Sequence, residues 1–282
     1  MAIIMDGKKL SEKILSELKS EVEELKSRGI KPKLSLILVG EDPSSKSYVK
    51  LKSRRARKIG IESEIHKLPE NIPESELICL IEKLNEDTSV HGVVIQMPLP
   101  PHINARRVVE KLNPIKDVDG LHPLNFGKLL LEEECLVSPA VEGIIALMKE
   151  YGIKASKKHA VILGATELTG KPAALMLMNM GADVTICHAE SPRINEIAKQ
   201  ADILIVDIAK PKAINSSMVK EKAVVFDCGF NYVEGKLVGD VDFESVSKVA
   251  SAITPVPGGV GPMIIAMLMK NLIKTIKMNF IK

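Results

Sequence analysis

The chain has 282 residues, of which 45% are hydrophobic and 27% are charged, and its net charge is +3. This length predicts about two globular domains. So small a net charge gives no support for a nucleic-acid-binding protein, and 3% aromatic residues disfavour base-stacking platforms. No apolar run approaches the ~18 residues of a membrane span. We therefore expect a globular protein that binds neither nucleic acid nor membrane.

The first half alternates between helix and strand patterns. Apolar residues at Leu10, Ile14, Leu18 and Val22 predict a long amphipathic helix. Asp42 is a candidate N-cap for the next helix, with Pro43 at its first position. The predicted elements are a helix at 7–29, a strand at 34–40, a helix at 41–60, a strand at 61–68, a helix from Pro73 to Asn85, and a strand from Val90 into the prolines at 98–101.

The middle of the chain contains a segment without clear periodicity. Residues 113–130 are rich in turn residues and predict a long ordered loop, of the kind that is often functional. A helix from Pro139 to Tyr151 follows and is expected to link the halves.

The second half predicts a doubly wound parallel sheet. The predicted elements are strands at 160–163, 183–187, 202–206 and 223–227, helices at 171–180 and 192–200, a small hairpin at 233–240, and a last helix at 263–277.

The turn after Val161–Leu163 directs backbone N–H groups and a helix N-terminus at one spot, where an anion would sit. However, the spacing of Gly164 and Gly170 fits neither the dinucleotide fingerprint nor the phosphate loop. A nucleotide site and an ordinary turn both remain open on this stretch alone.

Other candidate residues also have two interpretations. Tyr48 and Lys52 share a helix face and could bind and protonate a flat substrate, or form a surface pair. Gln96 ends a strand, where ligands bind in open α/β sheets, or faces solvent. Asp117 and Asp119 could accept N–H donors of a ring, or serve a turn.

Together these segments closely resemble the bifunctional methylenetetrahydrofolate dehydrogenase/cyclohydrolases. The resemblance covers nearly the whole chain, in the family's order. The matching motifs are YVxxK at 48–52, VIQMPLP at 94–100, KDVDGxHPxN at 116–125, GATxxxGKP at 164–172, DCGFN at 227–231, GDVDF at 239–243 and ITPVPGGVGPM at 253–263.

The resemblance implies two α/β domains flanking a cleft, the C-terminal one Rossmann-like, joined by long helices, in a homodimer. Residues 1–137 with 264–282 would bind folate, and 138–263 the dinucleotide. The implied enzyme is cytoplasmic, an expectation that also fits four cysteines without a C-x-x-C pair, no zinc pattern and no apolar signal peptide. It would oxidise 5,10-methylenetetrahydrofolate with NADP and hydrolyse the methenyl product to 10-formyltetrahydrofolate.

The resemblance also implies residue roles. Lys52 would catalyse the hydrolysis, with Gln96 orienting it, Tyr48 stacking on the folate and Asp119 holding the pterin. The remaining residues would line the two ligand sites: Pro257, Gly258, Gly259 and Val260 for folate, and Gly164, Ala165, Thr166, His188, Ala189 and Phe230 for the cofactor.

The chain departs from the family pattern at several positions. It has SPAV at 138–141, Ala209 in place of a glycine, and Ile264 in place of a threonine. A non-catalytic folate- or nucleotide-binding relative is therefore the alternative, and a different NAD-linked dehydrogenase would not explain the first half.

Cofactor choice is less directly indicated. Ala165 and Ala189 stand where many relatives have Arg or Ser for a 2′-phosphate, and Glu190 would repel one. Arg193 and a helix N-terminus could still hold the phosphate. The resemblance to the family, rather than these residues, implies NADP, with NAD as the less favoured cofactor.

Overall fold

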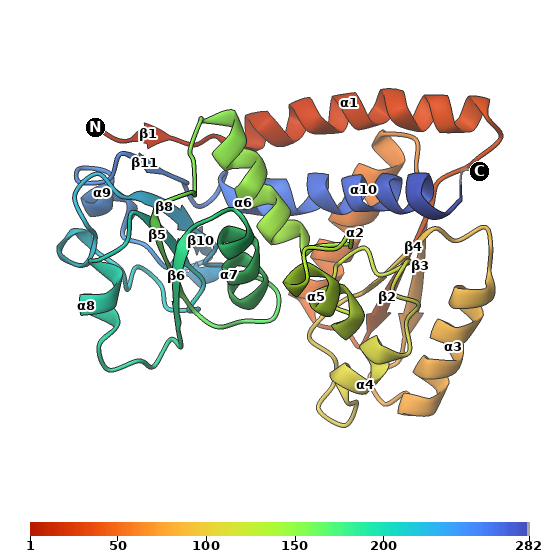
Figure 1. Cartoon of the computed structure of the whole chain (residues 1–282). Helices are drawn as coiled ribbons and strands as arrows, with labels where there is room; N and C mark the ends of the chain where they lie inside the picture. The colour runs from red at the N-terminus through yellow and green to blue at the C-terminus, as the bar shows by residue number, and fades with distance from the viewer. Residues whose placement is uncertain (281–282) are drawn as a thin grey trace. The chain divides into compact units, whose positions relative to one another are not determined.

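The computed structural model describes residues 1–280 and divides them into two compact units (Figure 1). The first unit contains Met1–Glu12, Leu129–Glu133 and Ser138–Met267. The second contains Lys13–Lys128 and Glu134–Val137, and of the last segment its described residues from Leu268 to 280. The division falls inside two long helices, α1 (Gly7–Ser27) and α10 (Val260–Asn279).

A parallel sheet of six strands, in the order β1-β11-β8-β7-β5-β6, forms the centre of the first unit. Its elements are β1 (Ile3–Ile4), α6 (Pro139–Glu150), β5 (His159–Leu163), α7 (Gly170–Asn179), β6 (Asp183–Cys187), α8 (Ile194–Ala198), β7 (Ile203–Val206), η1 (Ser216–Met218), β8 (Val224–Asp227), β9 (Asn231–Val233), β10 (Lys236–Val238), α9 (Phe243–Val246) and β11 (Ala252–Ile253).

The central strands of this sheet are apolar on both faces. Val161 and Leu163 of β5 join one core cluster with Leu204 of β7, whereas the alternate residue Ile162 points to the other face and is also fully buried. Burial on both faces explains the uninterrupted apolar runs, as expected for a parallel sheet. The predicted doubly wound sheet is confirmed.

The second unit is built on a three-stranded parallel sheet in the order β3-β2-β4. Its elements, besides most of α1 and α10, are β2 (Lys33–Val39), α2 (Pro43–Lys58), β3 (Glu62–Leu68), α3 (Glu74–Glu86), β4 (Gly92–Ile95), α4 (Ala105–Glu110) and most of α5 (Pro123–Leu130).

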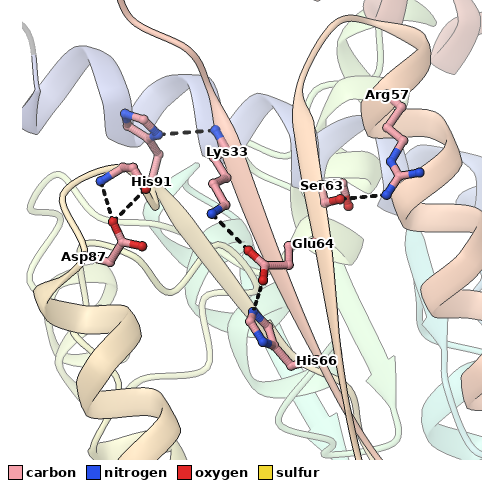
Figure 2. Close-up of polar contacts among 8 residues, drawn as sticks. Lys33, Arg57, Ser63, Glu64, His66, Asp87 and His91 are labelled. Carbon is pink, nitrogen blue, oxygen red and sulfur yellow. Dashed lines mark hydrogen bonds and ion pairs between the residues drawn. The ribbon is translucent and has the colours of Figure 1, made fainter.

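One face of this sheet packs on α3 and α4. Ile37 of β2 and Val93 of β4 form a buried cluster with Ile81 of α3 and Val108 of α4. Between the neighbouring strands β2 and β3, the Lys33 ammonium pairs with Glu64 at 2.9 Å (Figure 2). Strand β2 is the central strand of this sheet, and because all three strands are parallel, their carboxyl ends lie on the same side of the sheet.

Most predicted elements are confirmed, with small shifts of their ends. The prediction of an irregular segment over 113–130 is wrong in its second half, since Pro123–Leu130 forms α5. The helix predicted at 192–200 is shorter, Ile194–Ala198. The hairpin is present as β9 and β10, whereas α4, β1 and β11 were not predicted from the sequence.

Candidate functional site

Helix α2 supplies the first candidate side chains. The Asp42 carboxylate accepts a hydrogen bond from the Ser45 backbone at 2.6 Å, which caps the helix as predicted. This start directs Val49 and Lys52 to the buried face of the helix, with Tyr48 half-buried one turn before Lys52. A lysine on a buried helix face is unusual and requires polar partners.

Gln96 is the first of these partners. It follows directly after β4, where its backbone N–H continues the sheet by donating to Ile37. Its side-chain oxygen accepts a hydrogen bond from Lys52 Nζ at 3.3 Å, while its Nε2 donates to the Met97 carbonyl at 2.8 Å. Both ends of the amide are therefore used, and the amide presents its oxygen to the lysine without adding charge.

Asp119 is the second partner of the lysine. Its carboxylate lies 3.9 Å from Lys52 Nζ, and the two side chains are only 14% and 8% exposed. Burial raises the pKa of Asp119, and the nearby Lys52 charge opposes this rise. The structure thus brings Lys52, Gln96 and Asp119 together in the second unit.

Two residues just before Asp119, Lys116 and Asp117, fix its loop, and of these the sequence predicts a structural role only for Asp117, as a turn residue. The buried Lys116 ammonium donates to the carbonyls of Leu84, Asn85 and Asp87 at 2.8–2.9 Å, at the end of α3. The KDVDG sequence at 116–120 predicts a tight turn, but it does not indicate that the Lys116 side chain reaches carbonyls about 30 residues earlier in the chain.

The Asp117 carboxylate is committed to the loop itself. It accepts hydrogen bonds from the His122 backbone at 2.7 Å and from the Asn125 amide at 3.1 Å. Burial raises its pKa to about 6. From α10, Asn271 donates to the Val118 carbonyl at 2.9 Å. Asp119 therefore projects from a backbone that is held on both sides.

The predicted folate-lining residues Pro257, Gly258, Gly259 and Val260 belong to the first unit. They form the turn into α10, in which Gly258 has φ +114° and its carbonyl accepts from the Lys8 backbone at 2.9 Å. A Cβ on Gly7 would lie 1.9 Å from the Gly259 carbonyl oxygen. The start of α1 and this turn can approach so closely only because both carry glycine.

The turn after β5 is equally tight. Gly164 has φ +104°, and a Cβ there would lie 1.9 Å from the Asp207 carbonyl oxygen. The Thr166 hydroxyl donates to the Asp207 carboxylate at 2.8 Å and accepts from the backbone of Thr169 and Gly170. Two of the N–H groups expected to face an anion are thus satisfied by Thr166, while the half-buried Ala165 lies beside the turn.

The other cofactor candidates follow strands of the same sheet. His188 and Ala189 come directly after β6, and Phe230 lies three residues after β8 with its ring edge-on to Tyr232 at 5.6 Å. All of these residues lie beyond the carboxyl ends of parallel strands, where ligands bind in such sheets. Within residues 1–280, no group of three or more His, Cys, Asp or Glu is arranged to hold a metal ion.

Comparison with known proteins agrees with this geometry. The catalytic-domain model of tetrahydrofolate dehydrogenase/cyclohydrolase matches residues 5–119, and the NAD(P)-binding-domain model of the same family matches 138–280. The bifunctional protein FolD of Exiguobacterium sibiricum is 48% identical over 98% of this chain and 100% of its own length.

Solved structures give the same result. The bifunctional FolD of Campylobacter jejuni superposes with a TM-score of 0.96 at 47% identity, over 98% of this chain and 99% of its own. The Trypanosoma brucei enzyme, solved with NADP and an inhibitor, has a TM-score of 0.95 at 35% identity, over 100% of this chain and 99% of its own. The chain belongs to the tetrahydrofolate dehydrogenase/cyclohydrolase family.

Proposed function

We propose that this protein oxidises 5,10-methylenetetrahydrofolate with NADP to the methenyl compound and then hydrolyses that compound to 10-formyltetrahydrofolate. Membership of the family supports both reactions. The observation that carries the proposal is the contact of Lys52 with Gln96 and Asp119 inside the matched catalytic domain. A non-catalytic relative would have no need to hold a buried lysine between an amide and a carboxylate.

Lys52 acts in the hydrolysis. Water adds to the cationic carbon between the two nitrogens and loses a proton, which leaves a neutral carbinol. The bond from that carbon to the pterin nitrogen then breaks as this nitrogen gains a proton, and the carbinol hydroxyl releases its proton to solvent as the formyl carbonyl forms. One amine can accept the first proton and donate the second. The methenyl cation beside it favours the neutral amine, because like charges disfavour the ammonium form. The Gln96 oxygen fixes the position of Nζ.

Asp119 and Tyr48 position the substrate in this proposal. The Asp119 carboxylate is a buried acceptor for ring N–H donors of the pterin, and Tyr48 offers an aromatic face one helical turn from Lys52. Residues 257–260 supply backbone that a flat ligand can approach, since two of the four are glycines. The catalytic domain of the proposal comprises 1–137 with 264–282, and the dinucleotide domain 138–263.

The cofactor residues of the proposal are Gly164, Ala165, Thr166, His188, Ala189 and Phe230. Ala165 and Ala189 leave the turns after β5 and β6 open to a ligand, because neither carries a side chain beyond Cβ. Hydride transfer from the methylene carbon requires alignment with the nicotinamide and no protein base. NADP supplies the hydride acceptor, and these residues would hold it.

We propose further that the protein works as a homodimer in the cytoplasm. Two large apolar side chains of the first unit are exposed on the edge strand β6 and on the helix that packs beside it: Ile186 of β6 and Met178 of α7. Leu168, in the turn before α7, is also exposed. An edge strand with apolar neighbours favours covering by a second chain. No disulfide joins the four cysteines within residues 1–280, which suits a reducing compartment. Within residues 1–280, no helix is both long and apolar enough to cross a bilayer.

The two reactions are tested with one purified protein. Supplied with 5,10-methylenetetrahydrofolate and NADP, it should form NADPH, and supplied with methenyltetrahydrofolate alone, it should remove the methenyl absorbance faster than buffer does. NADPH formation without accelerated methenyl loss would reduce the proposal to a dehydrogenase. Binding of folate or NADP without either reaction would favour the non-catalytic alternative. Light scattering of the same sample measures the mass of the assembly.

A further inference from the structure

A lysine joins the loops that follow two strands of the six-stranded sheet. Lys210 lies four residues after β7, and its Nζ donates to the Ala189 carbonyl at 3.2 Å and to the Glu190 carboxylate at 3.1 Å. Ala189 and Glu190 follow β6, and β5 lies between β6 and β7 in the sheet. The Lys210–Glu190 pair therefore spans the carboxyl end of β5, beside the glycine turn.

The backbone that carries this lysine is held firmly. The fully buried Asp240 carboxylate accepts hydrogen bonds from the backbone of Ile208, Ala209 and Lys210 at 2.7–3.0 Å. Ala209 has a left-handed backbone, with φ +54°, which a residue other than glycine adopts only when its surroundings enforce it. Lys210 thus projects from a fixed point, although its side chain is 45% exposed.

The position of the pair relates it to the cofactor. In dinucleotide-binding sheets, the residues after the second strand of the βαβ unit contact the adenosine ribose, where an acidic residue accepts from the 2′-hydroxyl and a basic one accommodates a 2′-phosphate. Here that strand is β6, and the loop after it carries the acid Glu190, while Lys210 reaches the same loop from β7. Ala165 and Ala189 offer no charge of their own.

We infer that Lys210 is the residue that admits a 2′-phosphate and so sets the preference for NADP over NAD, with Glu190 as its counter-ion when no phosphate is bound. This inference rests on the proposed function and assigns the cofactor specificity of that site. The phosphate takes the place of the Glu190 carboxylate on Lys210, and Glu190, whose side chain is 82% exposed, turns into solvent. With NAD, Glu190 instead accepts the ribose 2′-hydroxyl.

Calorimetric titration with adenosine 2′,5′-bisphosphate and with adenosine 5′-monophosphate tests this without any folate. Lys210→Met should weaken binding of the bisphosphate at least about tenfold, about 1.4 kcal/mol, and change binding of the monophosphate less than about twofold. Lys220→Met is the matched control. Lys220 forms an ion pair with Asp202, which lies just before β7 and therefore at the amino end of that strand, away from the carboxyl end where Lys210 lies. It should change neither titration.

A second experiment replaces Glu190, the counter-ion of Lys210. Glu190→Gln should strengthen NADP binding and weaken NAD binding, because it removes a competitor for Lys210 and an acceptor for the hydroxyl. The inference is overturned if Lys210→Met weakens both adenosine ligands equally, if it weakens neither, or if Arg193→Met alone abolishes the discrimination. A wild-type protein that binds neither NADP nor NAD would overturn the proposed function itself. If Lys210→Met binds NADP as tightly as the wild type does, only this inference is overturned and the proposed function stands.

Discussion

Lys52 is the residue whose replacement separates the two proposed reactions. Lys52→Met should lower the rate of methenyl hydrolysis at least about a hundredfold, since it removes the proton carrier. NADPH formation should persist in part, so methenyltetrahydrofolate accumulates. Parallel assays of NADPH formation and methenyl loss measure both effects.

Lys50→Met is the control, because Lys50 is an exposed lysine of the same helix. It should leave both rates near those of the wild type. If Lys52→Met still hydrolyses the methenyl compound well above the uncatalysed rate, the lysine only binds substrate and the proposed proton transfer is wrong.

Ala209 allows a prediction about stability. Its φ of +54° strains an alanine, and glycine adopts this backbone without that cost. Ala209→Gly should therefore stabilise the protein by about 1 kcal/mol in urea unfolding, despite the greater freedom of glycine in the unfolded chain. Ala213→Gly, a few residues on at a half-buried position in the core cluster, should destabilise it instead. A loss of stability in both variants would show that Ala209 is not strained.

The sequence could predict that Lys52, Gln96 and Asp119 meet, because Lys52 lies on a helix, Gln96 just after a strand and Asp119 in the long loop of the same α/β half. Asp240 was not accessible. Its carboxylate binds backbone groups about 30 residues away, and a local motif with two aspartates cannot show which one is buried. Hydrogen bonds between residues far apart in the sequence form only once the sheet has folded.

At the scale of elements, the helices missed in the first half are the short ones. Helix α4 has six residues and α5 has eight, too few for an apolar period to be recognised. Both depend on partners outside the helix: Asn125 of α5 donates to the Asp117 carboxylate eight residues earlier, and Arg107 of α4 pairs with Glu74 of α3 at 3.0 Å. The longer helices, with their caps and apolar stripes, were predictable because their signals are local.

The end of helix α3 gives an element-scale prediction. Lys116→Met removes the ammonium group that bonds to three carbonyls there, which takes this donor from the buried Leu84 carbonyl and from the part-buried carbonyls of Asn85 and Asp87. We expect a loss of about 3 kcal/mol in the free energy of unfolding, measured in urea.

Lys111→Met provides the comparison, because Lys111 is exposed at the end of α4. It should cost no more than about 0.5 kcal/mol. Equal losses in the two variants would mean that the bonds of the Lys116 ammonium add nothing to stability.

At the scale of the whole molecule, the two units are not consecutive stretches of chain. The first residues join the first unit, where Ile3 of β1 pairs with Ala252 of β11, although about 250 residues separate them. Two-residue strands carry no periodic signal, so sequence could not predict this pairing. The two α/β layers themselves were predictable, because alternating apolar strands and amphipathic helices repeat in each half.

The pH dependence of global stability follows from a buried histidine of the second unit. His91 is 6% exposed, its Nδ1 accepts from the Lys33 backbone at 3.2 Å, and its ring lies edge-on to Phe280 at 4.8 Å (Figure 2 shows the Lys33 bond). Burial lowers its pKa from the usual 6.5, and the Lys116 charge acts in the same direction, against Asp87. Protonation of Nδ1 would also break the bond to Lys33.

The direction in which stability changes with pH follows from the difference between the folded and unfolded pKa values of His91. A folded-state pKa below the unfolded value means that the stability from neutral His91 is present above about pH 6.5 and is lost as the pH falls. Asp117 and Asp227 act in the opposite sense, since their pKa values are raised to about 6 and their contribution is lost as the pH rises through that value. A matched variant is therefore needed to isolate the histidine.

His91→Asn keeps an acceptor for the Lys33 N–H and removes the titrating ring. In urea unfolding, the stability advantage of the wild type over this variant should shrink by about 1 kcal/mol between about pH 7.5 and about pH 5.5. Asp87, Glu64, Lys33 and Lys116 face the same region and are present in both proteins, so their titration cancels in the difference. An advantage that stays constant across this range would show that His91 has the same affinity for protons in the folded and the unfolded chain.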